Sequence, residues 1–330
     1  MNNTQFKALM VNQDVNEFTT TISNFKVSDL PKGDILIKVA YSSVNYKDGL
    51  AATPNGKIVT SYPHIPGIDM AGTVISSTDP RYKEGDEVIA TSYEIGVSRF
   101  GGFSEFARIP AEWIVPLPDG LSMKEAMSFG TAGFTAALSI LRLEENGLSP
   151  DKGSVLVTGA TGGVGSFAVS ILSKLGYHVV ASTGKEDEHD YLVEIGANEI
   201  ISRQDLQPEK LRALDKQLWA GAIDPVGGNT LAYIVSTMKY GGSVAVSGLT
   251  GGINVPTTVF PFILRAVNIL GIDSVYCPMS TRSALWNRMA TDMKPTNLDT
   301  ITTEVMLEEL PSTLSLILEG KTKGRMVLKL

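Results

Sequence analysis

Closely spaced glycines are the residues of this chain whose pattern most directly suggests chemistry. Residues 156–165 read LVTGATGGVG, in which Ala160, Gly162 and Gly165 form an A-x-G-x-x-G pattern. A strand-like run precedes these residues and a long helical pattern follows, so the free N–H groups of a new helix would face a phosphate. The segment therefore predicts a dinucleotide-binding turn, and a purely structural glycine turn is the alternative.

Two other phosphate-binding motifs share part of this pattern and are excluded. A nucleoside-triphosphate loop needs a Lys-Ser/Thr pair after its glycines, and none follows here. The TGxxxGxG opening of short-chain dehydrogenases also fits the segment, but those enzymes need a Tyr-xxx-Lys catalytic pair. None of the ten tyrosines is followed four residues later by lysine.

The end of the second strand-like run of this region indicates which dinucleotide is bound. NAD-preferring folds place Asp or Glu about 20 residues after the glycines, to accept hydrogen bonds from the ribose 2′-hydroxyl. Here the chain has Ser182, Thr183, Gly184 and Lys185, and Arg203 follows the next strand-like run. Hydroxyls and cations suit a 2′-phosphate, which a carboxylate would repel. We expect NADP(H), with an exposed turn carrying an incidental lysine as the alternative.

Metal chemistry has little support in the composition. The chain has one cysteine, Cys277, and three histidines, His64, His178 and His189, at unrelated spacings. These residues cannot assemble a zinc site rich in cysteine or histidine. We expect the histidines in loops or at the surface and Cys277 as a packing residue.

The bulk composition narrows the class of protein. A chain of 330 residues with 43% hydrophobic and 19% charged residues predicts two folded domains. A net charge of −7 argues against a general nucleic-acid binder. The single cysteine and the absence of a signal pattern favour the cytoplasm, and we expect no apolar run long enough to cross a membrane.

The elements that must position these residues follow from the hydrophobic patterns. Short strand-like runs separated by Gly and Pro, typical of a partly open β-barrel, occupy 7–11, 35–44, 71–77, 86–92 and 104–109. A helix is predicted over 122–143, with Ser122 as N-cap and Glu125 completing a capping box.

Beyond that helix, strands and helices alternate, which predicts βαβ units with a parallel sheet. Helical patterns cover 162–176, 186–197 and 229–242, and a later one covers 304–324 before a final strand at 325–330. The expected organisation is a β-rich domain at 1–125, a nucleotide-binding domain at 126–271 and a return to the first domain at 272–330. The fold class is α/β.

Several longer motifs together resemble one enzyme superfamily across essentially the whole chain. They are VNYKD (44–48), PGIDMAG (66–72), GTAGFTA (130–136), VTGATGGVG (157–165), GAIDPVGG (221–228), YGGSVAVSGLTGG (240–252) and GRMVLKL (324–330). The chain resembles the medium-chain dehydrogenase/reductases, in the zinc-independent quinone-oxidoreductase-like branch, and most closely its acrylyl-CoA reductase subgroup. The resemblance implies a GroES-like catalytic domain, a Rossmann-type domain and a homodimer joined through an edge of the nucleotide-domain sheet.

The resemblance also implies roles for single residues. Asn45, Tyr46 and Asp48 match the family's Asn-x-x-Asp segment at the mouth of the active site, where Tyr46 would touch cofactor or substrate and either donate a proton or line the wall. Asp48 is expected more as a partner of backbone amides than as a catalytic group. The cofactor residues that it implies are Thr135, Thr161, Gly162, Gly163, Val164, Thr183, Gly184, Lys185, Arg203, Leu249, Ile263 and Ser274, to which the strand end adds Ser182.

Two departures from relatives bear on the reaction. Zinc-using relatives carry Gly-His-Glu where this chain has Gly67-Ile68-Asp69, which favours a zinc-free reduction of a C=C bond conjugated to a carbonyl. Quinone reductases place tyrosines just after the Asn-x-x-Asp segment, where this chain reads GLAATPNGK. An acryloyl-CoA-type enoyl thioester is therefore the leading substrate, with a quinone or a catalytically idle NADPH-binding protein as alternatives. Arg325 is open to two roles, contact with a substrate or a surface ion pair.

Overall fold

The computed structural model describes residues 3–14, 17–54, 56–59 and 61–330. The chain forms two compact units. Unit 1 comprises residues 1–131, 275–290 and 302–330, and unit 2 comprises residues 132–274 and 291–301. The first boundary lies six residues beyond the predicted one (131 against 125) and the second lies three residues beyond it (274 against 271). Residues 291–301, expected in the returning segment, belong to unit 2.

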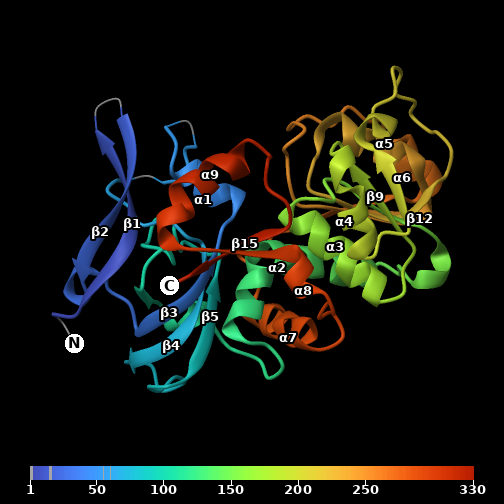
Figure 1. The fold of residues 1–330 in the computed structure, drawn as a ribbon. Coiled ribbons are helices and arrows are strands. Elements are labelled where there is room, and N and C mark those ends of the chain that lie inside the picture. The colour runs from blue at the N-terminus through green and yellow to red at the C-terminus, as the bar shows by residue number, and fades with distance from the viewer. Residues whose placement is uncertain (1–2, 15–16, 55, 60) are drawn as a thin grey trace. The chain divides into compact units, whose positions relative to one another are not determined.

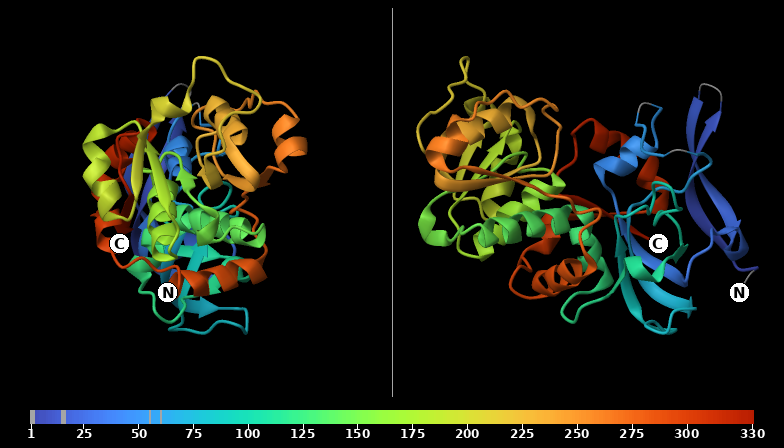
Figure 2. Two further views of the ribbon diagram at one scale, coloured as in Figure 1. Left: turned by 90° about the vertical axis from the view of Figure 1, so that its right-hand side faces the viewer. Right: turned by 180° about the vertical axis from the view of Figure 1, so that it is seen from behind.

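Unit 1 is built on an antiparallel β-rich sheet beside a two-stranded hairpin, which Figures 1 and 2 show in blue at the edge of the unit. The seven-stranded sheet has the order β14-β15-β3-β4-β5-β7, and β6 pairs with β3. Only β14 and β15 pair in parallel. The strands are β1 (Gln5–Asp14), β2 (Glu17–Lys26), β3 (Ile35–Ser43), β4 (Asp69–Ser77), β5 (Glu87–Thr91), β6 (Phe106–Ile109), β7 (Ile114–Pro116), β14 (Thr302–Val305) and β15 (Arg325–Lys329).

Apolar residues at alternate positions of β3 explain how one face of this sheet is buried. Ile35, Ile37 and Val39 of β3 lie in one hydrophobic cluster with Met70 and Val74 of β4. A spacing of two residues puts such side chains on the same face of a strand. Burial of this face holds β3 and β4 together, and their ends carry the residues discussed below.

Helices α1 (Tyr46–Ala51) and α9 (Leu310–Leu318) pack side by side in unit 1, as Figure 1 shows. A Cβ at Gly49 would lie 2.9 Å from Leu318, so glycine is what permits this close approach. The contact fixes the short helix that follows Asn45. Unit 1 also contains α7 (Met279–Ala290).

Helix α2 (Met123–Glu145) is bent at Gly130, which has φ 48° and ψ −155°. The sequence predicted one continuous helix here. The predicted capping box is present, because the Glu125 carboxylate accepts the Ser122 N–H at 2.8 Å and the Glu125 N–H reaches the Ser122 hydroxyl at 3.2 Å. Unit 1 ends at Thr131, directly after the bend.

By length and composition alone, α2 qualifies as a membrane span, contrary to the expectation that no run is long enough. Its best 18-residue window is 83% buried inside the structure. A core helix passes the same test, so this finding is weak evidence for a membrane.

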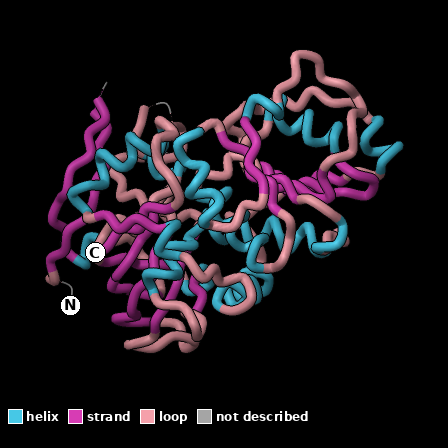
Figure 3. Tube along the Cα trace, turned by 45° about the vertical axis from the view of Figure 1, so that its right-hand side comes forward, coloured by secondary structure: helices cyan, strands magenta, loops and turns pink. Residues whose placement is uncertain are grey.

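Unit 2 contains a six-stranded parallel sheet with helices on either side of it (Figure 3). The strand order is β10-β9-β8-β11-β12-β13, so the chain starts in the middle, winds to one edge and then returns to wind to the other. This is the doubly wound order of a Rossmann-type fold. The strands are β8 (Val155–Val157), β9 (Val179–Thr183), β10 (Glu199–Ser202), β11 (Trp219–Asp224), β12 (Met238–Val246) and β13 (Asn268–Gly271).

Right-handed crossovers place the helices of the two halves on opposite faces of this sheet. Helix α3 (Gly163–Lys174) and helix α4 (His189–Glu194) connect β8, β9 and β10, whereas α5 (Gly228–Thr237) and α6 (Phe260–Arg265) connect β11, β12 and β13. The short helix α8 (Leu298–Ile301) completes the unit. The predicted fold class is confirmed.

Two predicted helices are too long. The helix predicted over 229–242 ends at Thr237, and residues 238–242 begin β12. The helix predicted over 304–324 is confined to Leu310–Leu318, because Thr302–Val305 forms strand β14 instead. In both places apolar residues continue across the junction, so hydrophobicity alone does not mark the change from period 3.6 to period 2.

Candidate functional site

The first part of the site is the turn between β3 and α1. Asn45 is the N-cap of α1, and the Asp48 carboxylate accepts the Asn45 backbone N–H at 2.8 Å, as in a capping box. The same carboxylate accepts the backbone N–H groups of Gly67 and Ile68 at 3.1 and 3.0 Å. Asp48 therefore joins α1 to the segment before β4, which matches the structural role expected for it. A catalytic role for Asp48 stays a prediction.

Asp48 is fully buried, and its surroundings oppose its charge. Burial and the nearby Asp69 carboxylate raise the pKa of Asp48 to about 7, although the N–H groups of Asn45 and Ile68 act in the opposite direction. Asp48 therefore changes its charge near neutral pH.

Asp69 is the centre of the polar cluster next to this turn. Its carboxylate, which is fully buried, accepts the Ser43 hydroxyl at 2.6 Å and the Asn45 side-chain amide at 2.7 Å. It also accepts the backbone N–H and the hydroxyl of Thr131, at 2.8 and 2.5 Å. The guanidinium of Arg325 lies 3.7 Å away.

Arg325 is not at the surface, and this corrects the expectation of a surface ion pair. Its side chain is 3% exposed and forms a buried pair with Asp69. Its N–H groups are also bonded to Ser43, Val44, Asn45 and Ser128. His64 lies in a loop, outside the named strands and helices, as expected, but it is buried there and its ring packs edge-on against Phe100. His178 and His189 are exposed and Cys277 is buried, as expected.

Tyr46 is the one member of the Asn45–Asp48 turn that is strongly exposed. Its side chain is 47% exposed, whereas Asn45 and Asp48 are buried. No hydrogen bond to the Tyr46 hydroxyl occurs within the part of the chain that the structure describes. The turn therefore presents a phenol to its surroundings and keeps the amide and the carboxylate inside.

The donor set of this region does not fit zinc. Ile68, at the position where zinc-using relatives carry histidine, is buried and offers no ligand atom. The carboxylate of Asp69 is already engaged by the bonds described above. Across residues 3–14, 17–54, 56–59 and 61–330, no group of three or more His, Cys, Asp or Glu residues could hold a metal ion.

Unit 2 has its own group of candidate residues, at the glycine-rich turn between β8 and α3. A Cβ at Gly165 would lie 2.3 Å from the Gly159 carbonyl oxygen, so this glycine permits the close contact of α3 with the turn. A Cβ at Gly162, by contrast, would meet only that oxygen, at an ordinary 3.4 Å. The fold itself therefore does not require a glycine at 162, and the space left there suits a ligand that approaches the backbone. Gly163 and Val164 form the first turn of α3, and Thr161 is buried beside them.

At the end of β9, the side chain of Arg203 lies against the backbone of a glycine, Gly184. A Cβ at Gly184 would lie 2.2 Å from a guanidinium nitrogen of Arg203, so the guanidinium lies directly over this glycine. The guanidinium is exposed and has no hydrogen-bond or ion-pair partner among the described residues. Thr183 accepts the Lys185 N–H at 3.0 Å, and Ser182 and Thr183 are buried at the strand end. The predicted 2′-phosphate residues are thus neighbours.

The remaining predicted cofactor residues fall into two groups. The Thr135 hydroxyl donates to the Ser274 hydroxyl at 2.9 Å, so these two buried side chains are neighbours. Leu249 and Ile263 are instead 64% and 68% exposed, on a loop and on α6. The structure does not unite them with the glycine-rich turn, and their role stays a prediction.

Two carboxylates that organise the site were missed from the sequence, Asp69 and Asp224. The Asp224 carboxylate, at the end of β11, accepts the Thr158 hydroxyl at 2.5 Å and the N–H groups of Val226 and Gly227 at 3.1 and 2.9 Å. Burial raises the pKa of Asp224, against the effect of these bonds. Its position at the carboxyl end of a parallel strand, within GAIDPVGG, was the available signal.

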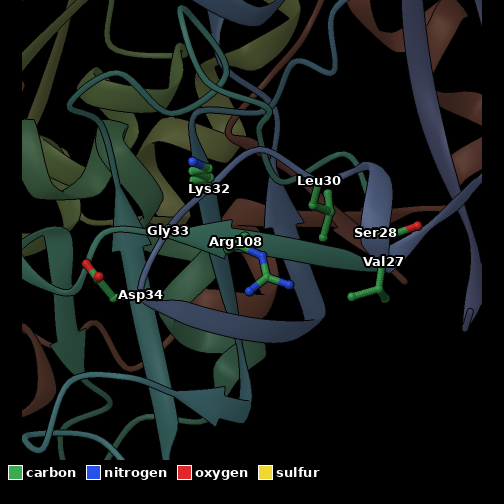
Figure 4. A pocket seen from close by; sticks show the side chains of 7 residues that line it. All are labelled: Val27, Ser28, Leu30, Lys32, Gly33, Asp34 and Arg108. Atoms are coloured by element: carbon green, nitrogen blue, oxygen red, sulfur yellow. The ribbon is translucent and has the colours of Figure 1, made fainter. Parts of the chain in front are cut away.

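A pocket in unit 1 lies apart from these residues. It measures about 530 Å³ and is lined by Val27, Ser28, Leu30, Lys32, Gly33, Asp34 and Arg108 (Figure 4). Asp34 in this pocket accepts the Ala111 N–H at 3.1 Å. None of the predicted site residues lines the pocket, so we do not assign it to the reaction.

The fold and these motifs define a class of protein that the domain families confirm. Residues 31–119 match the alcohol dehydrogenase GroES-like domain, and residues 163–291 match the zinc-binding dehydrogenase family. The chain belongs to the medium-chain dehydrogenase/reductase superfamily, in the branch that contains quinone-oxidoreductase-like proteins and acrylyl-CoA reductases.

Individual relatives resemble the chain over almost its whole length. YhfP of Bacillus subtilis, which is provisionally named a quinone oxidoreductase, is 61% identical over 99% of both chains. Its crystal structure with NAD bound superimposes with a TM-score of 0.98 and covers 99% of this chain and 100% of that one. Acrylyl-CoA reductase AcuI of Ruegeria pomeroyi is 47% identical over 98% of both chains. The YhdH oxidoreductase of Salmonella enterica in complex with NADP is 46% identical, with a TM-score of 0.96, and the match covers 98% of this chain and 99% of that one.

We predict that alanine lowers stability much more at one glycine of the turn than at the other. Gly165→Ala should lower the free energy of unfolding by about 1–3 kcal/mol, because its Cβ collides with backbone atoms. Gly162→Ala should change it by less than about 1 kcal/mol, because φ is −82° and the space is open. Urea unfolding of both variants measures these changes. Equal losses of unfolding free energy would contradict the conclusion that the space at Gly162 is open.

We also predict that the free energy of unfolding depends on pH through Asp48. An acid whose pKa is higher in the folded state stabilises the fold when protonated, and this contribution disappears as pH rises from about 4 to about 7. The loss amounts to roughly 4 kcal/mol at most, from three pKa units at about 1.4 kcal/mol each. Asp48→Asn should remove this part of the pH dependence.

Urea unfolding at pH values from 4 to 8 measures the difference. The slopes of unfolding free energy against pH are compared, and not the absolute stabilities. The reason is that an amide at position 48 faces the Asn45 N–H and lowers stability at every pH. Asp187→Asn, at an exposed position in unit 2, is the control. An unchanged slope in Asp48→Asn would show that other groups cause the pH dependence.

Proposed function

We propose that this protein is a zinc-independent, NADPH-dependent reductase of C=C bonds conjugated to a carbonyl, with an acryloyl-CoA-type enoyl thioester as substrate. The observation that carries the cofactor part is the end of β9, where the Arg203 guanidinium lies against Gly184 and residues 182–185 include no carboxylate. A guanidinium in this position can bind a 2′-phosphate through two parallel hydrogen bonds. A cytoplasmic location, as expected from the single cysteine, is part of the proposal.

The glycine-rich turn supports the same cofactor. The open space at Gly162 would admit the pyrophosphate, next to the N–H groups that begin α3. Thr161, Gly163 and Val164 would complete this contact. Asp224 would act at a distance, because its bond to the Thr158 hydroxyl fixes the residue before the turn.

The substrate class follows from what the Asn45–Asp48 turn presents. NADPH, when bound, supplies a hydride, and the reduction of a conjugated C=C bond then requires stabilisation of negative charge on the carbonyl oxygen and one proton. Hydrogen-bond donors suffice for that charge, so no metal is needed. The exposed Tyr46 hydroxyl is the donor that we assign to this task. Asn45 and Asp48 would hold the turn that carries it.

Relatives support two substrates. An acrylyl-CoA reductase is 47% identical to this chain over 98% of its length. The B. subtilis relative, provisionally a quinone oxidoreductase, is 61% identical, which favours a quinone as the second candidate. We place the thioester first because the residues after Asp48 lack the tyrosines of quinone reductases.

A homodimer is also part of the proposal, with β13 at its centre. β13 is the edge strand of the sheet in unit 2 and pairs only with β12. Ile269 of β13 is 42% exposed, and Ile263 and Leu264 of α6 are 68% and 57% exposed. An open strand edge beside exposed apolar residues suits a second copy related by a twofold axis, since both copies then present the same surface.

The reaction can be tested by the oxidation of NADPH or NADH with acryloyl-CoA, crotonyl-CoA and benzoquinone as acceptors. We expect turnover with NADPH and the acyl-CoA compounds, and an unchanged rate after dialysis against a zinc chelator. Turnover of benzoquinone alone would reverse the order of the two substrates. Tight NADPH binding without turnover of any acceptor would favour an idle NADPH-binding protein.

Three variants test the cofactor part in the same assay and by calorimetry. Arg203→Ser and Lys185→Glu should weaken NADPH binding roughly tenfold or more, because each removes a charge from the 2′-phosphate. NADH binding should be unchanged in Arg203→Ser. Gly162→Ala should weaken the binding of both cofactors. Lys210→Glu, an exposed charge change in unit 2, is the control. Equal affinity of the wild type for NADH and NADPH would contradict the proposed preference.

Light scattering of the purified chain tests the homodimer. We expect twice the 35.3 kDa mass of one chain, and one chain mass after Ile269→Lys, because lysine at a strand edge opposes edge-to-edge pairing. Leu316→Lys, at an exposed apolar position of unit 1, should leave the dimer intact. A monomeric wild type would refute this part of the proposal.

A further inference from the structure

Arg325 is a buried cation whose hydrogen bonds converge on the β3–α1 turn. Its Nη1 donates to the Val44 carbonyl at 3.0 Å and to the Asn45 side-chain oxygen at 3.2 Å. Its Nη2 donates to the Ser43 hydroxyl at 2.8 Å. One planar guanidinium thus contacts three consecutive residues before Tyr46. Lysine could not reproduce these directions, because its ammonium lacks a planar fork of donors.

Asp69 holds the same turn from the other side. Its carboxylate accepts the Asn45 amide nitrogen at 2.7 Å, while Arg325 donates to the oxygen of that amide. The orientation of the Asn45 side chain is therefore set by two charged neighbours of opposite sign. The amide nitrogen also donates to the Ser43 carbonyl at 3.3 Å, so both of its hydrogens are used within the protein.

This arrangement bears on Asn45, which the family's Asn-x-x-Asp segment places among the candidate catalytic residues. A side-chain amide has two donor hydrogens and one carbonyl oxygen, and all of these groups are engaged inside unit 1. Asn45 is also only 7% exposed. Its effect must pass through its backbone, which begins α1 and determines where Tyr46 lies.

The cluster is packed too tightly to rearrange without loss. A Cβ at Gly130 would lie 2.4 Å from the Ser43 hydroxyl, 2.6 Å from the Asp69 carboxylate and 2.8 Å from Arg325. The bend of α2 therefore packs directly against all three side chains of the cluster. Since the charges are buried together, loss of one leaves the other without its counter-ion.

We propose that Arg325 and Asp69 are positioning residues for the reaction, which fix the Asn45–Tyr46 backbone and thereby place the Tyr46 hydroxyl. This inference rests on the proposed function of Tyr46. It assigns the positioning of Tyr46 to a pair of residues from β4 and β15, neither of which needs to touch substrate. A purely structural pair would affect stability and activity together, whereas a positioning pair affects activity beyond its effect on stability.

A double-mutant cycle separates these two roles. Arg325→Met leaves the Asp69 carboxylate unpaired and should lower the melting temperature. Adding Asp69→Asn removes that charge and should restore part of the lost melting temperature. We expect kcat with acryloyl-CoA to stay at least tenfold below the wild-type value in the double variant. KM for NADPH should change less than twofold, because unit 2 is unaltered.

Two further variants serve as references. Arg325→Lys keeps the charge but not the planar fork of donors. Compared with Arg325→Met, it should therefore regain more of the wild-type melting temperature than of the wild-type kcat. Lys124→Met with Glu304→Gln removes a partly exposed ion pair of 3.2 Å between α2 and β14, together with the longer Glu304–Lys329 pair of 3.9 Å, and should leave kcat unchanged. Recovery of kcat in proportion to the melting temperature, in either Arg325→Lys or the double variant, would overturn the positioning role.

A spectroscopic measurement makes the test independent of turnover. With 3-fluorotyrosine incorporated at position 46, we expect one narrow ¹⁹F resonance in the wild type and in the Lys124–Glu304 control. The double variant should show a shifted or broadened resonance at a temperature where it remains folded. An identical resonance in the double variant would overturn the inference. If the wild type reduces no acceptor, the proposed function fails, and the ¹⁹F result still decides whether Arg325 and Asp69 fix Tyr46.

Discussion

The burial of charge at the start of α1 is the constraint on which unit 1 depends. Two carboxylates, Asp48 and Asp69, and one guanidinium, Arg325, lie in the interior, where an unpaired charge is very costly. Each is satisfied only because separate segments supply its partners: β3, the α1 turn, β4, the bend of α2 and β15. The bend at Gly130 has the same origin, since it brings the Thr131 N–H to Asp69. The polar cluster therefore determines how these elements meet as much as the apolar core does.

Unit 2 also contains a buried carboxylate that joins separate segments, although fewer groups take part. The Asp224 carboxylate at the end of β11 binds the hydroxyl of Thr158 at the end of β8 and two backbone N–H groups of its own loop. The adjacent ends of two parallel strands are thereby tied together where the glycine-rich turn begins. Preorganisation of this kind lowers the cost of ordering a loop when a ligand binds. In both units, a buried carboxylate fixes the residues that are expected to contact a ligand.

Sequence patterns predicted the fold class, most strands and the glycine-rich turn, because these depend on local periodicity and on backbone space. The pairing of Arg325 with Asp69 could not be predicted, since nothing in the sequence relates residues 256 positions apart. The same limit explains why Arg325 was left open between a substrate contact and a surface ion pair, and why the burial of His64 was not anticipated. Strand β14 and the bend of α2 were missed for a related reason, because tertiary partners override local helical propensity there. At the site, residue types were informative about the cofactor, whereas the role of Asn45 depended on contacts that only the structure supplies.

The discontinuity of unit 1 has a consequence for the order of events during synthesis. Unit 2 is complete once residue 301 has left the ribosome, whereas unit 1 still lacks β14, α9 and β15. Until residue 325 emerges, Asp69 has no cation beside it, and strand β3 has an open edge where β15 will pair. The larger part of unit 1 must therefore wait, incompletely closed, while residues 132–301 are made, of which all but residues 275–290 belong to unit 2. Contacts between such distant segments form slowly, and the exposed edge is where a chaperone would have most to protect.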